Sequence, residues 1–489
     1  PRHPRASSLG SCPRPAAFLP RALSRGLINK RSPKLLASGQ HHDAMPPNDT
    51  SGTGDVFAQL QASGQEHILA GWNFLEDSQQ HELLASIKKF DTSRCNRIFK
   101  TSVNAKAADN TSILPPRAQD VCRIQDVTQK DRVKYLSVGY KMIANGKYGV
   151  ILMAGGQGTR LGSSAPKGCY DIGLPSGKSL FQLQAERILR VQQLAAESIF
   201  GEGARVTKPV RWYVMTSPMT HEETEAFFQK KGYFGLLKEQ VVFFQQGTMP
   251  CFTAEGKLIM SSASSLAEAP DGNGGLYRGL SQWGCLADMR RHGVEAVDCV
   301  SVDNALVRVC DPVFAGYCRA KGAEAGARVV SKAYPEEKVG VFARRANGAT
   351  EVVEYSDIDP ALATSETEDG DLRFNWGNVC MHYFTRSFLE RAESALEKAA
   401  LYHVARKQIP SKDGPVDGIK LEMFIFDTFP LAKKVSLFEV IREEEFAPVK
   451  NAPGSATDSP GTARDLLLSL HAGWAEYAGA QVEPGAAVE

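Results

Sequence analysis

Residues 148–168 read YGVILMAGGQGTRLGSSAPKG, and this stretch decides the fold. Its first six residues, 148–153, form a short apolar run, which is typical of a strand buried on both faces of a parallel sheet. Four glycines follow within eight residues, so backbone N–H groups can approach an anion without Cβ atoms in the way. Arg160 and Lys167 add positive charge at the same place. The stretch therefore predicts a buried strand followed by a loop that grips phosphate.

Two other phosphate-binding loops are excluded by their spacing. The dinucleotide fingerprint G-x-G-x-x-G would need a glycine at position 161, which is leucine. A P-loop would need Gly-Lys-Ser or Gly-Lys-Thr at a fixed distance after its first glycine, and none follows at that distance. The residues instead resemble the signature G-G-x-G-T-R-L-G-x-x-x-P-K of the sugar-nucleotide pyrophosphorylases, a group of nucleotidyltransferases, and every fixed position of the signature is present.

The composition is that of a large folded chain with little net charge. Its 489 residues are 43% apolar, with 57 basic side chains against 55 acidic ones. Residues 1–42 carry eight Arg or Lys and no Asp or Glu, which leaves 49 basic against 55 acidic side chains in the rest. A mildly acidic body without a basic stripe argues against nucleic-acid binding. No apolar run reaches the roughly 20 residues of a transmembrane helix, so no membrane partner is expected.

Two features bear on the cellular compartment. The basic, acid-free composition of residues 1–42 is typical of an organellar transit peptide, whereas Met45 is the first methionine and translated upstream sequence would give the same pattern. Ten cysteines are scattered without a C-x-x-C pair, which indicates reduced thiols of an intracellular protein and neither a disulfide frame nor a zinc site. We therefore expect a cytoplasmic protein, with organellar import if residues 1–42 are expressed.

Strands and helices alternate along the body of the chain. Strands are expected at 148–153, 212–215, 241–244, 297–302, 327–332, 340–345, 350–355 and 435–440. Helices are expected at 129–144, after the capping box Ser179-x-x-Gln182, from Thr220 to near Gly232, from Asp311, and from Asp417 to Pro430. This alternation predicts an α/β fold with a Rossmann-like, doubly wound mixed sheet. Ligands of such sheets bind beyond the carboxyl ends of strands, where the strand order reverses.

Eight sequence blocks in order resemble the eukaryotic UDP-N-acetylglucosamine (UDP-N-acetylhexosamine) pyrophosphorylase family, from about residue 56 to 479. The blocks are the loop 155–168, 243–247, 269–277, 302–304, 352–356, 377–378, 418–420 and 442–451. The resemblance implies a nucleotide-diphospho-sugar transferase (GT-A-like) fold and a monomer or homodimer. The implied reaction joins UTP and N-acetylglucosamine 1-phosphate into UDP-N-acetylglucosamine and diphosphate with Mg²⁺ or Mn²⁺, the last step of UDP-N-acetylglucosamine biosynthesis.

We expect the chain to have four parts. They are a disordered basic extension and linker at 1–55, a helical region at 56–144, the nucleotidyltransferase catalytic domain at 145–450, and a carboxy-terminal helix at 451–489. Family members continue into a small β-rich domain, which we expect to be missing here. The sequence also departs from the family pattern at 266–268 and slightly at 380–382, the latter near the expected sugar pocket.

The family's site residues map onto single positions of these blocks. The UTP-binding positions are Leu152, Ala154, Gly155, Gly156, Lys167, Gln246, Gly272, Asp303 and Lys420. The sugar-phosphate positions are Asn273, Glu354, Tyr355, Asn378 and Lys450. Both sets make chemical sense, because Gln246 can both donate to and accept from a uracil edge, and amides and carboxylates suit hydroxyl and acetamido groups.

The chemistry calls for positive charge and alignment more than for a general base. The second pKa of a phosphate monoester is about 6, so the attacking sugar phosphate is already an anion at neutral pH. We assign Arg160 and Lys167 to the β- and γ-phosphates, Lys420 to the α-phosphate and Lys450 to the sugar phosphate. Asp303 is either a Mg²⁺ ligand or a hydrogen-bond partner of uridine. The competing hypotheses are a UDP-glucose or general UDP-sugar pyrophosphorylase, and a catalytically silent paralogue that binds UDP-sugar.

Overall fold

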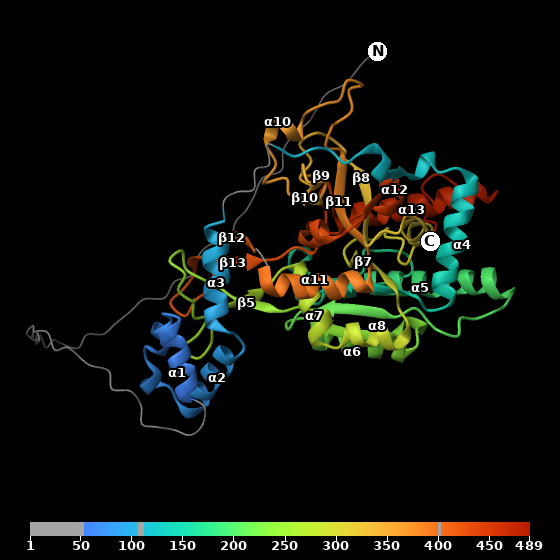
Figure 1. Cartoon of the computed structure of the whole chain (residues 1–489). Coiled ribbons are helices and arrows are strands. Elements are labelled where there is room, and N and C mark those ends of the chain that lie inside the picture. Colours follow the sequence, from blue (N-terminus) through green and yellow to red (C-terminus); the bar gives the residue numbers. More distant parts are fainter. Residues whose placement is uncertain (1–52, 106–111, 400–401) are drawn as a thin grey trace, which may run out of the picture. The chain divides into compact units, whose positions relative to one another are not determined.

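Figure 1 shows the computed structural model, which describes residues 53–105, 112–399 and 402–489. The transit-peptide hypothesis for residues 1–42 lies outside the described residues, as does most of the expected linker. Within the described ranges, none of the helices has the length and apolarity needed to span a bilayer. The nine cysteines of these ranges are free thiols, in line with the prediction from their scattered positions.

A mixed sheet of ten strands forms the centre of the described residues. Its main path runs β1-β14-β8-β11-β7-β2-β3-β4, with β9 and β10 attached beside β11. The strands are β1 Val121–Arg123, β2 Tyr148–Met153, β3 Trp212–Thr216, β4 Val241–Gln245, β7 Ala296–Ser301, β8 Ala325–Ser331, β9 Val341–Arg344, β10 Thr350–Val353, β11 Trp376–Thr385 and β14 Val435–Glu439.

The strand order reverses beside β2. Strands β2, β3 and β4 pair in parallel in sequence order, whereas β7 pairs in parallel with β2 on its other side. Strand β11 is antiparallel to both β7 and β8, and β8, β14 and β1 are again parallel neighbours. The carboxyl ends of β2 and β7 therefore adjoin at a topological switch point, where α/β sheets bind their ligands.

Helices cover both faces of this sheet (Figure 1). Side chains of α4, α5, α6 and α9 pack on one face, and side chains of α7, α8 and α11 pack on the other. Their bounds are α4 Gln129–Ala144, α5 Leu180–Phe200, α6 His221–Lys230, α7 Leu276–Gln282, α8 Cys285–His292, α9 Pro312–Lys321 and α11 Arg386–Ala399. The expected doubly wound α/β fold is thus confirmed.

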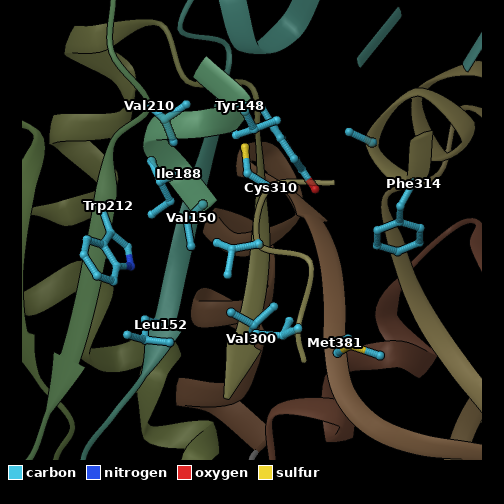
Figure 2. Close-up of a cluster of buried hydrophobic side chains, with 14 of the residues drawn as sticks. Tyr148, Val150, Leu152, Ile188, Val210, Trp212, Val300, Cys310, Phe314 and Met381 are labelled. Atoms are coloured by element: carbon cyan, nitrogen blue, oxygen red, sulfur yellow. The ribbon is translucent and has the colours of Figure 1, made fainter. Parts of the chain in front are cut away.

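Strand β2 shows why this sheet needs cover on both faces. Its six residues are all buried. Tyr148, Val150 and Leu152 point into the cluster drawn in Figure 2, which also holds Trp212 of β3. Residues 151 and 153 belong to the cluster on the opposite face. Because successive side chains of a strand alternate between faces, an unbroken apolar run can be buried only between two layers of helices.

A helical region packs on two small β-hairpins. The region comprises α1 Thr53–Ala62, α2 Asp77–Lys88 and α3 Thr92–Val103. One hairpin is formed by β12 His403–Ile409 and β13 Val416–Glu422, and the other by β5 Thr248–Pro250 and β6 Glu268–Pro270. The helices and both strand pairs contribute to one apolar cluster. The buried Gln65 strengthens this contact, because its side chain accepts from the N–H of Leu258 and donates to the carbonyl of Gly256, each at 2.9 Å.

The expected helix from Asp417 to Pro430 is wrong. The segment begins with strand β13, which pairs antiparallel with β12 from Val416↔Ile409 to Glu422↔His403. The buried side chains of Ile419 and Leu421 are two positions apart, which is the period of a strand, and both belong to the cluster under the helical region. A 3₁₀ run, Ile425–Leu431, follows and contains Pro430. Lys420 therefore lies on a strand and not on a helix.

The helix caps agree with the sequence only in part. Ser179 caps α5 by accepting a hydrogen bond from the N–H of Gln182 at 3.3 Å, but the Gln182 side chain donates to Glu186 and does not complete the capping box. The Thr220 side chain makes no cap for α6, because its hydroxyl accepts from the N–H of Ser217 at 3.1 Å. For Thr220, this competing hydrogen bond in the preceding turn explains why the side chain does not cap the helix.

Buried charges join the middle of the sheet to the segment that precedes Lys450. The guanidinium of Arg328 on β8 is fully buried and pairs with Asp298 of β7 at 3.1 Å and with Glu445 of α12, Arg442–Glu445, at 3.0 Å. Removing one partner of a buried ion pair is costly, because the remaining charge loses its compensation. The network therefore holds β7, β8 and α12 together.

We expect Arg328→Met to lower the free energy of unfolding by about 3–5 kcal/mol, because two buried carboxylates lose their cation. Lys147→Met is the matched control. Its ion pair with Glu295 spans 2.8 Å but is largely exposed, so its loss should cost about 0–1 kcal/mol. Urea denaturation followed by circular dichroism measures both values. A loss for Arg328→Met no larger than that of the control would contradict the role of the network.

Candidate active site

The loop after β2 closes on itself at the switch point. The N–H of Lys167 donates to the carbonyl of Gly156 at 3.1 Å, and the N–H of Gly158 donates to that of Ala165 at 3.0 Å. A Cβ at position 156 would meet no atom within 4 Å, so this exposed backbone is open to a ligand. Arg160 is exposed on the short turn Thr159–Leu161. The loop thus offers backbone amides and two cations at one edge of the sheet.

Asp303 connects this loop to the end of β7. Its carboxylate lies 3.6 Å from the Nζ of Lys167, and both side chains are largely buried. The Ser301 hydroxyl donates to the same carboxylate at 2.7 Å. The backbone carbonyl of Asp303 accepts from the N–H of Val449 at 2.8 Å, which brings the segment bearing Lys450 to this point. Lys167, Asp303 and the residue that precedes Lys450 therefore meet here.

Asn304 clamps the same segment. Its side-chain oxygen accepts from the N–H of Ala447 at 2.9 Å, and its NH₂ donates to the carbonyl of Glu445 at 2.7 Å. Because Asn304 is buried and both ends of its amide are paired, it has a single allowed orientation.

The predicted uridine side depends on close approach of backbones. Gly155 lies so near the buried Gln246 that a Cβ would come within 2.9 Å of the Gln246 side-chain oxygen. Gly272 has a φ of +88°, and a Cβ there would lie 2.3 Å from the carbonyl oxygen of Met423. Only glycine fits at position 272, because the φ is left-handed and the space is filled by backbone. The structure thus brings Gly155 and Gln246 together.

The predicted sugar side gathers around Gly340, just before β9. A Cβ at Gly340 would lie 2.8 Å from the Glu354 carboxylate, and the Gly340 carbonyl accepts from the N–H of Asn378 at 2.7 Å. Burial raises the pKa of Glu354, and nearby acids add to this effect against the opposing charges of His403 and Lys450. The electrostatic influence of Lys450 reaches both Glu354 and Cys380. Glu354, Asn378 and Lys450 therefore share one neighbourhood.

The remaining predicted residues make fewer described contacts with the predicted uridine side and the predicted sugar side. Leu152 is part of the core, so only its backbone could face a ligand, and Ala154 is buried beside it. Tyr355 is half exposed. Lys420 is half-buried on β13, and no described contact joins it to Lys167.

Several cations at the site lack a carboxylate partner. Arg160, Lys420 and Lys450 make no ion pair with any residue that the structure describes. Lys450 instead lies 5.9 Å from the ring centre of Phe446. Cations without acidic partners are what two polyanionic substrates require.

Two histidines that sequence reasoning did not assign to the site border the sugar side. His403 on β12 hydrogen-bonds Asp427 at 3.0 Å. Burial lowers the pKa of His403, but the hydrogen bond and charge of Asp427 outweigh burial, and the net pKa is raised. His382 on β11 is fully buried and contacts Asn378 at 2.9 Å. The only sequence feature that indicates a role for His382 is the departure from the family pattern at 380–382, near the expected sugar pocket.

The residues present fit a divalent cation held mainly by substrate. Within the described ranges, no group of three or more His, Cys, Asp or Glu side chains could hold a metal alone. Mg²⁺ is commonly bound by one or two carboxylates together with phosphate oxygens. Asp303, at the carboxyl end of β7 beside the phosphate-binding loop, supplies such a carboxylate.

Known proteins are similar to this chain in sequence and in architecture. The family described as UTP–glucose-1-phosphate uridylyltransferase matches residues 87–483. UDP-N-acetylglucosamine diphosphorylase 2 of Arabidopsis thaliana is 50% identical over 428 residues, which cover 87% of this chain and 85% of the relative. UDP-N-acetylglucosamine pyrophosphorylase of Saccharomyces cerevisiae is 40% identical over 451 residues, which cover 87% and 92%.

A solved structure agrees as well. The crystal structure of the uridine diphosphate N-acetylglucosamine pyrophosphorylase from Trypanosoma brucei, in complex with inhibitor, matches with a TM-score of 0.80 and 34% sequence identity. The match covers 90% of this chain and 89% of that one. The resemblance inferred from the sequence blocks is confirmed, and the chain belongs to the UTP–glucose-1-phosphate uridylyltransferase family.

Proposed function

We propose that the chain is a UDP-N-acetylglucosamine diphosphorylase, which converts UTP and N-acetyl-α-D-glucosamine 1-phosphate into UDP-N-acetylglucosamine and diphosphate. The observation that carries the proposal is the meeting of Lys167, Asp303 and the segment before Lys450 at the switch point. The two relatives described above, 50% and 40% identical, bear the name of this activity and support it.

The reaction is a substitution at the α-phosphorus of UTP. An oxygen of the sugar 1-phosphate forms the new bond, and the bond between the α-phosphorus and the bridging oxygen of the diphosphate breaks. The attacking oxygen is already anionic at neutral pH, since its second pKa is about 6. The protein's task is to align two polyanions and to compensate their charge.

The cations divide this task. Arg160 and Lys167 bind the β- and γ-phosphates and the departing diphosphate, Lys420 binds the α-phosphate, and Lys450 holds the sugar phosphate. Gly155, Gly156 and Gly272 let the backbone approach the nucleotide, whose uracil edge pairs with Gln246. A bound Mg²⁺, or Mn²⁺, held by Asp303 and phosphate oxygens would neutralise charge on the triphosphate.

The sugar is recognised by groups of the neighbourhood around Gly340. Glu354 accepts hydrogen bonds from sugar hydroxyls, and Tyr355 beside it borders the ring. Asn273 and Asn378 serve the acetamido group, which glucose 1-phosphate lacks. A cytoplasmic location and a monomeric or homodimeric state remain predictions from the sequence.

We expect the sugar preference to follow the acetamido group. With UTP and Mg²⁺, kcat/KM for N-acetylglucosamine 1-phosphate and N-acetylgalactosamine 1-phosphate should exceed that for glucose 1-phosphate at least about tenfold. Glucose 1-phosphate lacks the acetamido group, so the polar side chains that would bind this group stay unpaired when glucose 1-phosphate occupies the site. Diphosphate release measures the rates. The highest rate with glucose 1-phosphate would support a UDP-glucose pyrophosphorylase, and calorimetric binding without turnover would support a silent paralogue.

Lys167→Ala and Lys420→Ala should each lower kcat by about 10²–10³-fold, because each removes a charge that stabilises the transition state. Both variants should keep the circular dichroism spectrum of the parent. Lys230→Ala is the matched control, since Lys230 is exposed at the carboxyl end of α6, a helix that follows β3. Rates near the parent value for both active-site variants would refute the phosphate assignments.

Removing divalent cations with EDTA should abolish turnover, and added Mg²⁺ should restore it. Asp303→Asn should raise the Mg²⁺ concentration needed for half-maximal rate by about tenfold or more, because it removes the negative charge of the proposed ligand. Steady-state rates over a range of Mg²⁺ concentrations measure the change. An unchanged Mg²⁺ requirement with a raised KM for UTP would show that Asp303 binds uridine instead.

A further inference from the structure

Strand β11 is interrupted where it passes the sugar side of the site. Its pairing with β8 shifts between Asn378, opposite Val329, and Met381, opposite Arg328. Two residues of β11 therefore stand where the partner strand has none. Cys380, at this bulge, has a φ of 55°, in the left-handed region that non-glycine residues rarely adopt. Bulges of this kind redirect side chains and are frequent beside active sites.

The bulge surrounds the side-chain oxygen of Asn378 with two groups. The backbone N–H of Cys380 donates to this oxygen at 3.3 Å, and the Nε2 of His382 lies 2.9 Å from it. A backbone N–H can only donate, so the atom that it faces must be the amide oxygen and not the NH₂. The contact with His382 therefore requires a proton on Nε2, and this fixes the imidazole tautomer.

His382 is held in this neutral form by its surroundings. The residue is fully buried, its ring packs against Phe384 and Phe429, and its Nδ1 has no hydrogen-bond partner in the described part of the chain. Burial, and then the charge of Arg328, lower the pKa of His382 to about 3. A second proton on Nδ1 would be buried without an acceptor, so Nε2 carries the only proton and donates it to Asn378.

Asn378 is consequently left with donors alone. Its oxygen is occupied from two sides, and its NH₂ makes no hydrogen bond to any described residue. The oxygen of Asn273, the other amide of the predicted sugar site, is also engaged by the protein, because it accepts from the N–H of Ile425 at 2.9 Å. An amide that can only donate, as Asn378 can, suits a ligand carbonyl, whereas a sugar hydroxyl can be served by a donor or an acceptor.

We propose that His382 is a positioning residue that locks the Asn378 amide with its NH₂ toward the sugar pocket, and that this lock favours sugar phosphates carrying an acetamido carbonyl. The inference rests on the proposed function, because it concerns how the same site chooses its sugar. His382 itself touches no substrate. Without its donor, the Asn378 amide is held only by the longer bond from Cys380, and the amide can turn.

The first test replaces the imidazole in two ways. His382→Phe keeps an aromatic ring between Phe384 and Phe429 but removes the donor, and it should raise KM for N-acetylglucosamine 1-phosphate about tenfold, the effect of one lost hydrogen bond. KM for UTP should stay within about twofold, and the preference over glucose 1-phosphate should fall by the same factor. His382→Gln places an NH₂ near the position of Nε2 and should restore most of the preference.

A matched control separates positioning from packing. Tyr383→Phe alters the next residue of β11, whose side chain lies in the cluster on the opposite face and whose hydroxyl has no partner in the described residues. This variant should leave both KM values unchanged. If His382→Phe is too unstable to assay, His382→Gln is compared with the parent protein and with Asn378→Ala, which lacks the amide. The proposal is overturned if His382→Gln loses as much sugar preference as Asn378→Ala does.

A double-mutant cycle tests whether His382 acts through Asn378. In the Asn378→Ala background, His382→Phe should change KM for N-acetylglucosamine 1-phosphate by less than about twofold, since the amide that it orients is gone. Full additivity of the two losses would overturn the proposal. Absence of turnover with N-acetylglucosamine 1-phosphate in the parent protein would instead refute the proposed function, so the two failures are distinguishable.

Discussion

The active site depends on the hydrogen bonds of Asn304. This buried amide follows β7 by three residues and binds the backbone of a segment more than 140 positions further along the chain. The segment carries Lys450, while the residue before Asn304 faces the phosphate-binding loop. The two substrates must meet in line for substitution at phosphorus, and a small displacement is costly to such a reaction. The fully paired amide of Asn304 thus sets the distance between the segment that carries Lys450 and the loop that carries Lys167.

The first half of the site could be predicted from sequence because its signals are local. The apolar run of β2 and the helix α4 have the bounds that their patterns indicate, 148–153 and 129–144. The glycine spacing of the following loop is the spacing expected where a backbone must approach phosphate closely. A strand that is apolar at every position can be accommodated only between two helical layers, so even the layer order follows from the pattern.

The second half depends on contacts between distant segments, which leave little local trace. The sequence predicts a helix from Asp417 to Pro430, which would include Lys420, whereas seven cross-strand pairs with β12 make the segment a strand. The bulge in β11 depends on register against β8, and the tautomer of His382 depends on the bulge. The family resemblance supplied Asn378, but only the three-dimensional arrangement shows which end of its amide remains available.

The position of β11 has a consequence for synthesis. It lies between β7 and β8 although it is made after both, so the sheet remains divided until residues 376–385 have left the ribosome. Strands β2, β3, β4 and β7, beside which the proposed nucleotide site lies, are contiguous in the sheet and complete by residue 301. The nascent chain therefore carries this half of the sheet with an exposed strand edge, at β7, for the next 75 or so residues of elongation, about 4–15 seconds at ordinary translation rates. Closing that edge is the same event that brings the sugar side into place.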